Sequence, residues 1–208
     1  MIVEGILNKP IDSNSFVLYE KGNSSCIVVD PGTSDCIGLL NFFKINNLIP
    51  EYVFLTHEHF DHIWGVNKLK ESFPCKTVCS KECAEKIVDS KKNMSIFYNQ
   101  IGFKTFPADI LIENIDFNLI WNNLKIEFIV SKGHTEGSIC IFVEDKLFSG
   151  DTIIKDHKTV VKFPGGNKNN LLNSLDIMFS KFDRKTIYVY PGHGNCFFLN
   201  EIAIEQLV

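Results

Sequence analysis

Thr56-His57-Glu58-His59-Phe60-Asp61-His62 is the stretch that decides how this 208-residue chain folds. It holds three of the six histidines and directly follows the apolar run 52–55, which predicts a buried strand. Imidazoles and a carboxylate are ligands that zinc and similar divalent metals prefer. Alternation along the strand end would place His57 and His59 on one side, and the next turn would carry Asp61 and His62 toward a second ion.

Three further candidate ligands share this context, because each follows a β-like run in a glycine-rich turn. They are His134 in the stretch 132–138, Asp151 in 148–152 and His193 in 191–194. Function commonly lies on loops at strand ends, and glycine lets the backbone approach an ion closely. A lone histidine after a strand is more often an ordinary surface or core residue. Five of the six histidines at such positions nevertheless indicate a metal site jointly.

Composition and charge exclude several classes of protein. The chain is 45% hydrophobic and 22% charged, which predicts one globular domain over residues 1–208. A net charge of −4 argues against a nucleic-acid binder. We expect no membrane segment, since no apolar run is long enough to span a bilayer and Glu4 interrupts any signal-peptide core. Seven cysteines, an odd number, favour reduced thiols and a cytoplasmic location.

The rest of the pattern predicts strands in groups, with helices between them in both halves. Strands are expected at 2–7, 16–19, 26–29, 52–55, 76–79, 110–112, 117–120, 125–130, 138–143, 146–148 and 186–190, and helices around 39–43, 66–73, 81–88, 171–182 and 201–207. Residues 89–108 are the least readable, and a loop or short helix over the site and an excursion of the core are equally compatible with them. We therefore predict an α/β domain of two packed sheets with helices outside.

In chain order, the cluster His57-x-His59-x-Asp61-His62, then His134, Asp151 and His193, resembles the metallo-β-lactamase-fold hydrolases. The resemblance is greatest to the glyoxalase II-like, or hydroxyacylglutathione hydrolase-like, branch. Patterns typical of that branch recur at 27–32, 133–138, 149–152, 163–166 and 191–194. The resemblance covers nearly the whole chain. It implies a metallo-β-lactamase-like αβ/βα sandwich of two mixed β-sheets with helices on the outer faces.

The resemblance also implies a metal-dependent hydrolase with two divalent ions. His57, His59 and His134 would bind the first ion, Asp61, His62 and His193 would bind the second, and Asp151 would bridge both. Zinc is the expected metal, with iron or manganese as alternatives. A hydroxide held between ions about 3.5–4 Å apart would attack the carbonyl of a thioester or related small acyl substrate. Asp61 would also be catalytic, by orienting the nucleophile or carrying a proton.

Substrate specificity follows less directly from these motifs. The chain stops soon after His193, so we do not expect the C-terminal helical domain with which full-length glyoxalase II helps to hold glutathione thioesters. The stretch 155–162 also lacks the Gly-Arg-Thr-Asp run found in small relatives. Lys162 and Lys168 flank Pro164-Gly165-Gly166, and Lys162 is a candidate for binding an anionic part of the substrate.

Other functions remain open on the same ligand set. A lactonase would use the same hydrolytic chemistry. A persulfide-dioxygenase-like oxidoreductase would use one iron at positions of the His57, His134 and Asp151 type. An RNA-processing nuclease is disfavoured by the acidic balance of the chain. A non-catalytic metal protein is disfavoured because structural zinc sites are usually closed by four ligands. The oligomeric state does not follow from the sequence.

Overall fold

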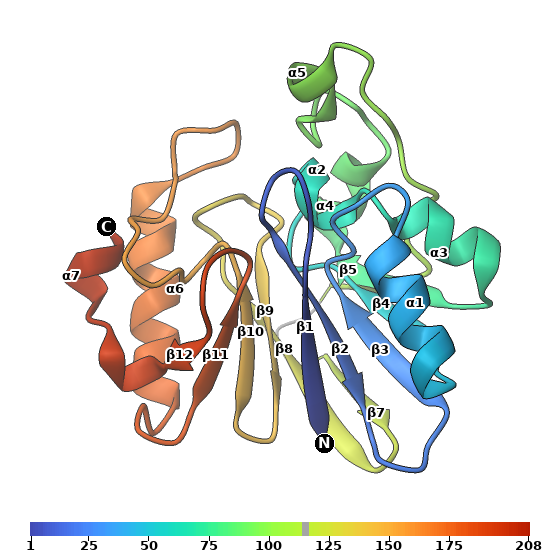
Figure 1. The fold of residues 1–208 in the computed structure, drawn as a ribbon. Helices are drawn as coiled ribbons and strands as arrows, with labels where there is room; N and C mark the ends of the chain where they lie inside the picture. The colour runs from blue at the N-terminus through green and yellow to red at the C-terminus, as the bar shows by residue number, and fades with distance from the viewer. Residues whose placement is uncertain (114–116) are drawn as a thin grey trace.

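The computed structural model describes residues 1–113 and 117–208, and within them two six-stranded β-sheets pack face to face (Figure 1). The first sheet has the spatial order β1 (Ile2–Leu7), β2 (Asn14–Tyr19), β3 (Ser25–Val29), β4 (Ile49–Phe54), β5 (Lys76–Ser80) and β6 (Ile110–Ile112). The second has the order β12 (Phe197–Phe198), β11 (Tyr188–Pro191), β10 (Lys146–Gly150), β9 (Ile139–Val143), β8 (Leu124–Val130) and β7 (Asn118–Trp121).

Both sheets are mixed. In the first sheet β1, β2 and β3 pair antiparallel, whereas β3 to β6 pair parallel. In the second sheet β10 and β11 pair parallel and the other neighbours pair antiparallel. The predicted sandwich of two mixed sheets is therefore confirmed.

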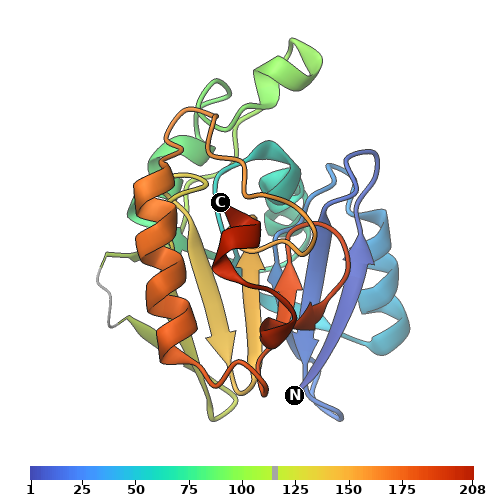
Figure 2. The same ribbon diagram turned by 90° about the vertical axis from the view of Figure 1, so that its left-hand side faces the viewer.

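Helices cover the outer faces of the two sheets (Figures 1 and 2). The helices are α1 (Ile37–Asn46), α2 (Phe60–Ile63), α3 (Val66–Ser72), α4 (Lys81–Ile87), α5 (Ser95–Asn99), α6 (Lys168–Lys181) and α7 (Ile204–Leu207), with a 3-10 turn η1 at Leu199–Glu201. The first sheet carries α1 and α3, and the second carries α6 and α7. No helix among the described residues is long and apolar enough to cross a bilayer.

Side chains that alternate along the strands pack into separate layers of the core. In β2, Val17 packs into the cluster that also contains Leu39 of α1, while Phe16 and Leu18 face the second sheet. Phe54 of β4 meets Phe128 of β8 across the sheets, with ring centroids 5.1 Å apart. The assignment of residues 1–208 to one domain stays a prediction, and this shared core supports it.

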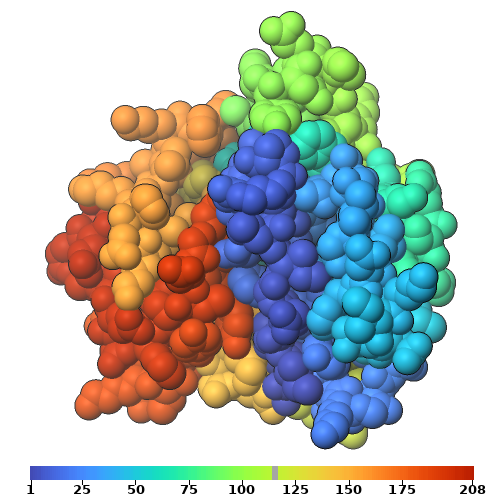
Figure 3. Space-filling model, viewed as in Figure 1, coloured from blue at the N-terminus to red at the C-terminus, as the bar shows by residue number. Residues whose placement is uncertain are grey.

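Most predicted elements are present. Of the differences, β4 begins at Ile49, three residues before the predicted strand, and the short helix α2 was not predicted. Others lie near the C-terminus and in the least readable segment. The strand expected at 186–190 begins two residues later, as β11. The helix expected at 201–207 is replaced by η1 and the shorter α7, because extended residues separate them. Residues 89–108 contain only α5, on a segment that projects from the molecule above the strand ends (Figures 2 and 3).

Candidate metal centre

The loops at one end of the sheets carry every histidine and aspartate predicted to bind metal. The cluster from His57 to His62 follows β4, and α2 begins within it at Phe60. His134 follows β8, Asp151 directly follows β10, and His193 follows β11. Parallel pairing of β10 with β11 places the last two at the same sheet edge.

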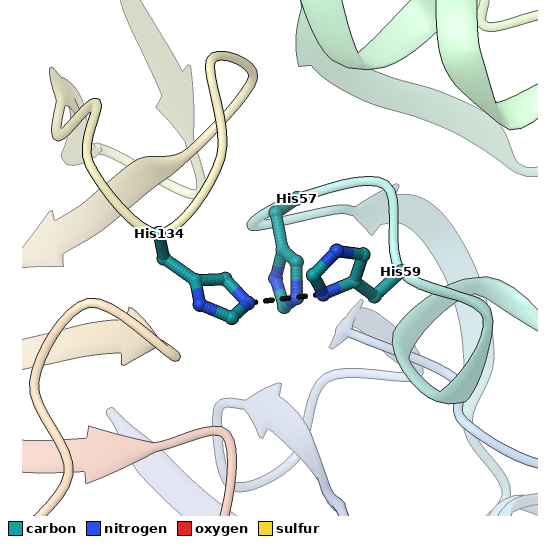
Figure 4. Close-up of side chains that lie close together, drawn as sticks. All are labelled: His57, His59 and His134. Atoms are coloured by element: carbon teal, nitrogen blue, oxygen red, sulfur yellow. Dashed lines mark hydrogen bonds between the residues drawn. The ribbon is translucent and has the colours of Figure 1, made fainter. Parts of the chain in front are cut away.

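The first candidate metal group consists of three imidazoles that converge from two loops (Figure 4). One ring nitrogen each from His57, His59 and His134 lies within 4.8 Å of the others. The closest pair is His59 Nδ1 and His134 Nε2, which are 3.0 Å apart. All three side chains are buried, with His57 only 1% exposed. A packed core does not explain three buried imidazoles whose nitrogens point at one another.

The second group consists of Asp61, His62 and His193. Asp61 Oδ2 lies 3.6 Å from His62 Nε2 and 3.3 Å from His193 Nε2. Asp151 stands between the two groups. Its Oδ1 is 3.5 Å from His62 Nε2, and its Oδ2 is 3.6 Å from His134 Nε2 and 3.7 Å from His193 Nε2. The arrangement brings together all seven residues predicted to bind metal.

Hydrogen bonds at the far ring nitrogens orient four of these imidazoles. His62 Nδ1 lies 3.1 Å from Asp30 Oδ2, His134 Nδ1 2.7 Å from the Val160 carbonyl, and His193 Nδ1 3.2 Å from the Asp12 carbonyl. An oxygen acceptor at Nδ1 requires a proton there, so Nε2 is the ring nitrogen left to bind a cation once it carries no proton.

The fourth imidazole, His57, is fixed through a hydroxyl relay. The Thr56 hydroxyl donates to Asp30 Oδ2 at 2.6 Å, so it can only accept from His57 Nδ1 at 3.1 Å. The Nε2 atoms of His57 and His62 and the Oδ1 atom of Asp151 are buried with no hydrogen-bond partner among the described residues. Buried polar atoms are rarely left unpaired. Lone pairs converging in this way fit divalent cations.

Asp30 is a site residue that the sequence reasoning missed. Its carboxylate accepts the Thr56 amide at 2.8 Å, the Thr56 hydroxyl and the His62 ring, and it is 2% exposed. Asp30 also groups with His57 and His62 as a potential ligand, but these hydrogen bonds already occupy both oxygens. We interpret it as the residue that positions two histidines. The available signal was an acidic residue directly after the buried strand β3.

A profile of the family described as Metallo-beta-lactamase superfamily matches residues 8–193. The chain belongs to the metallo-β-lactamase superfamily. The hydroxyacylglutathione hydrolase of Francisella tularensis is 30% identical over 207 residues, covering 96% of this chain and 71% of that relative. The crystal structure of BLEG-1 B3 metallo-beta-lactamase matches with a TM-score of 0.89 and 27% identity, covering 96% and 95% of the two chains. The structure of TTHA1623 in a di-iron-bound form matches with a TM-score of 0.80 and 21% identity over 95% of each chain, which shows the fold alone.

These findings confirm the resemblance to the superfamily and to its glyoxalase II-like branch. They make the chain a metallo-hydrolase with histidine and aspartate metal-binding groups.

Histidines of the two ligand groups of this metallo-hydrolase differ in the direction of their pKa shifts. Burial lowers the pKa of His59 to about 3 and that of His57 well below its usual value. Burial acts the same way on His62, but neighbouring carboxylates, Asp61 first, outweigh it and raise its pKa to about 10. At neutral pH His57 and His59 are therefore ready to bind a cation, whereas His62 has to release a proton.

Glycines permit the close approach of the loops in this superfamily site. A Cβ at Gly192 would lie 2.2 Å from Asp151 Oδ1 and 2.7 Å from a carbon of the His62 ring. Gly150 has a φ of +50°, and a Cβ there would lie 2.3 Å from the Thr56 hydroxyl. Side chains at either position would displace the residues that hold the site together.

A cavity of about 400 Å³ opens onto the metal-binding residues. His59, Asp61, His134, Asp151 and His193 line one part of it. The other lining residues are apolar or aromatic: Ile11, Phe60, Met94, Phe97, Tyr98, Val160 and Phe163. Part of the unreadable segment 89–108 thus reaches the site, in agreement with the interpretation of this segment as a short helix over the site.

Lys162 does not line this cavity. It borders a separate cavity of about 420 Å³ together with Lys158 and Lys168, so its role in substrate binding stays a prediction. His157 lines a third cavity, which shares His134, Asp151 and His193 with the first. Cys196 lines a different cavity, beside residues of β1 and β2, and burial raises the pKa of its thiol to about 11.

Proposed function

We propose that this protein is a dinuclear zinc hydrolase that cleaves a thioester or a related small acyl substrate in the cytoplasm. We assign His57, His59 and His134 to one ion, Asp61, His62 and His193 to the other, and Asp151 to both. The observation that carries the proposal is the set of four Nε2 atoms oriented by hydrogen bonds at Nδ1, three of which lie within 3.7 Å of Asp61 or Asp151. Seven unpaired cysteines, six of them buried, support the location.

Two bound divalent cations would lower the pKa of a water from about 15.7 toward 7 and polarise the substrate carbonyl. The chain supplies orientation and proton transfer. Asp61 lines the cavity, and its Oδ2 lies 3.3 Å from His193 Nε2, so its carboxylate can orient the attacking water or accept a proton from it. The pKa of Asp61 is low despite its burial, because His62 and His193 favour the carboxylate form.

The hydrogen-bond partners of the ligand histidines keep the imidazole rings in fixed orientations during the reaction. Asp30 fixes His62 directly and His57 through Thr56, and the Val160 carbonyl fixes His134. Such partners raise ligand basicity and hold the ring orientation. The positions of the metal-facing atoms are therefore set before any cation or substrate binds.

The test combines metal analysis with a substrate panel. Protein expressed with balanced metals is analysed for zinc, iron and manganese, and zinc-loaded protein is offered hydroxyacyl thioesters, lactones and a β-lactam. We expect two equivalents of zinc and turnover of at least one thioester. Turnover of lactones alone would move the assignment to a lactonase.

Iron is the specific alternative, because a structural neighbour binds two irons. One equivalent of iron with oxygen uptake would replace the hydrolase by an iron-dependent oxidoreductase. An oxygen-electrode measurement with a persulfide substrate, run beside the thioester assay, separates these outcomes.

A further inference from the structure

An apolar wall borders the metal-site cavity. We define this apolar wall as Phe60, Met94, Phe97 and Tyr98, contributed by α2 and by the segment around α5. Phe97 is 69% exposed and Tyr98 is 41% exposed. Exposed apolar groups collected around a cavity indicate a binding surface more often than isolated ones do.

Hydrogen bonds and ring stacking hold the apolar wall in place. Asn93, which is fully buried, donates to the carbonyls of Ile87 and Phe103 at 3.2 and 2.9 Å, and Phe103 N donates to the Ser95 hydroxyl at 2.9 Å. A wall fixed in advance lowers the entropy cost of binding an apolar group.

Stacked rings connect this segment to the metal-binding cluster. The Tyr98 ring stacks on Phe60 with centroids 4.8 Å apart, and Trp64 stacks on Phe103 at 5.7 Å. Phe60 directly precedes Asp61, so the apolar wall is fixed relative to the metal-binding residues.

The charged side chains near the cavity also favour an apolar ligand. No lysine or arginine of the described chain lines this cavity. Lys86 is held by Glu58 at 2.9 Å and by Glu136 at 3.3 Å. A carboxylate on the part of the substrate that enters here would find no lysine or arginine side chain to pair with.

The neighbouring cavity of about 340 Å³ differs from the first in two charged or titratable residues, although Ile154 and Val160 also line it. It shares His134, Asp151 and His193 with the first cavity, but His157 and Lys158 also line it. Thiols that carry acyl groups in water are polar, so the cavity lined by His157 and Lys158 suits the leaving thiol. The apolar cavity then suits the acyl group.

We propose, resting on the proposed thioester hydrolysis, that the substrate carries an uncharged apolar acyl chain that lies against the apolar wall. Its carbonyl faces the metal-binding residues, and its thiol points toward His157 and Lys158. Phe97 and Tyr98 thus determine specificity by the length of chain that they cover.

The first test uses thioesters of uncharged N-acetylcysteamine, from acetyl to octanoyl, with the metal-loaded protein. We expect kcat/KM to rise about fourfold per methylene until the apolar wall is covered. Phe97→Ala should lower the octanoyl-to-acetyl ratio of kcat/KM about tenfold or more. Ile101→Ala is the matched control, because Ile101 lies on the same segment, is 82% exposed and does not line the cavity. Its ratio should not change.

The second test needs no turnover. Calorimetry compares the binding of acetate, hexanoate and octanoate to the metal-loaded protein and to Phe97→Ala. We expect affinity to increase with chain length in the unsubstituted protein and to be nearly independent of length in the variant.

The two tests separate the inference from the proposed function. Thioester hydrolysis that is insensitive to acyl length, or that depends only on the length of an alkyl chain on the thiol, would overturn the inference and leave the function standing. Absent thioester hydrolysis with length-dependent carboxylate binding would overturn the function alone. A dimer that Phe97→Ala dissociates, with unchanged chain selectivity, would assign these aromatics to an interface and overturn the inference.

Discussion

The ligand-bearing loops and the apolar wall border the same cavity but are built by opposite means. Five of the seven ligands are buried, Asp151 and His193 are half-buried, and four of the five histidine rings are fixed by hydrogen bonds to neighbouring oxygens. The wall includes exposed rings on a projecting segment with one five-residue helix, α5. Metal binding and catalysis thus depend on loops at the rigid strand ends. We assign substrate selectivity to a segment whose residues can be replaced without disturbing the sheets.

The largest effect should come from the carboxylate between the two ligand groups. Asp151→Ala removes the oxygens that lie within 3.7 Å of three imidazole nitrogens. We expect kcat/KM to fall about a thousandfold or more, because metal stabilisation of the transition state contributes several kcal/mol. Activity and metal content are measured together. The control is Asp156→Asn on an exposed loop position, and near-normal activity of Asp151→Ala would refute the bridging role.

A smaller loss should follow when the ligands remain and their support changes. Asp30→Asn keeps the size of the side chain but cannot accept hydrogen bonds from Thr56 and His62 at both of its terminal atoms. We expect metal affinity to fall about 10–100-fold, measured by competition with a chromophoric chelator. The control is Asp35→Asn. Asp35 is exposed, and its carboxylate accepts a hydrogen bond from the amide of Ile37. Unchanged metal affinity in Asp30→Asn would mean that His62 keeps its orientation without the hydrogen bond to Asp30.

The ligand-bearing loops could be predicted from the sequence. Apolar runs such as 52–55 give strands, and polar residues directly after them meet at one sheet edge. The roles of Asp30, the Val160 carbonyl and the Asp12 carbonyl could not be predicted, because they depend on which loops meet in space. A backbone carbonyl can accept a hydrogen bond whatever its residue type, so the sequence does not reveal which carbonyl does so.

The apolar wall could not be predicted for a different reason. The flanks of α5 are left-handed residues other than glycine, Met94 with φ 68° and Gln100 with φ 63°, so the usual breaker signal is missing. Its apolar residues show no helical period because the helix is too short to have a buried face. Their exposure reflects a cavity that is formed with distant loops, including the one that carries Phe163.

A third prediction tests the electrostatics of the ligand-bearing loops through pH. The pKa of His62 is raised from 6.5 to about 10, so its contribution to the free energy of unfolding is complete below pH 6.5 and is lost as pH rises through 10. Chelator-treated protein should therefore lose several degrees of Tm between pH 7 and pH 10. His62→Gln should lack this loss, and zinc should diminish it by replacing the proton. Equal slopes in both proteins would refute the assignment.

The smallest effect should come from loosening the apolar wall while the ligands stay intact. Asn93→Ala leaves the amide of Ser95 without its present partner, at a cost of about 1–3 kcal/mol for a buried group left unsatisfied. It also removes one hydrogen bond from each of the carbonyls of Ile87 and Phe103, which keep Thr105 and Ser95 as donors. Because few elements pack on this segment, we expect the cost to appear as local opening. Amides of 93–103 should exchange faster, and the preference for long acyl chains should fall a few-fold while metal content is unchanged. Asn173→Ala, at an exposed position of α6, is the matched control. If Asn93→Ala instead lowered metal content, the two regions would be coupled in stability, and the division of chemistry from selectivity would be wrong.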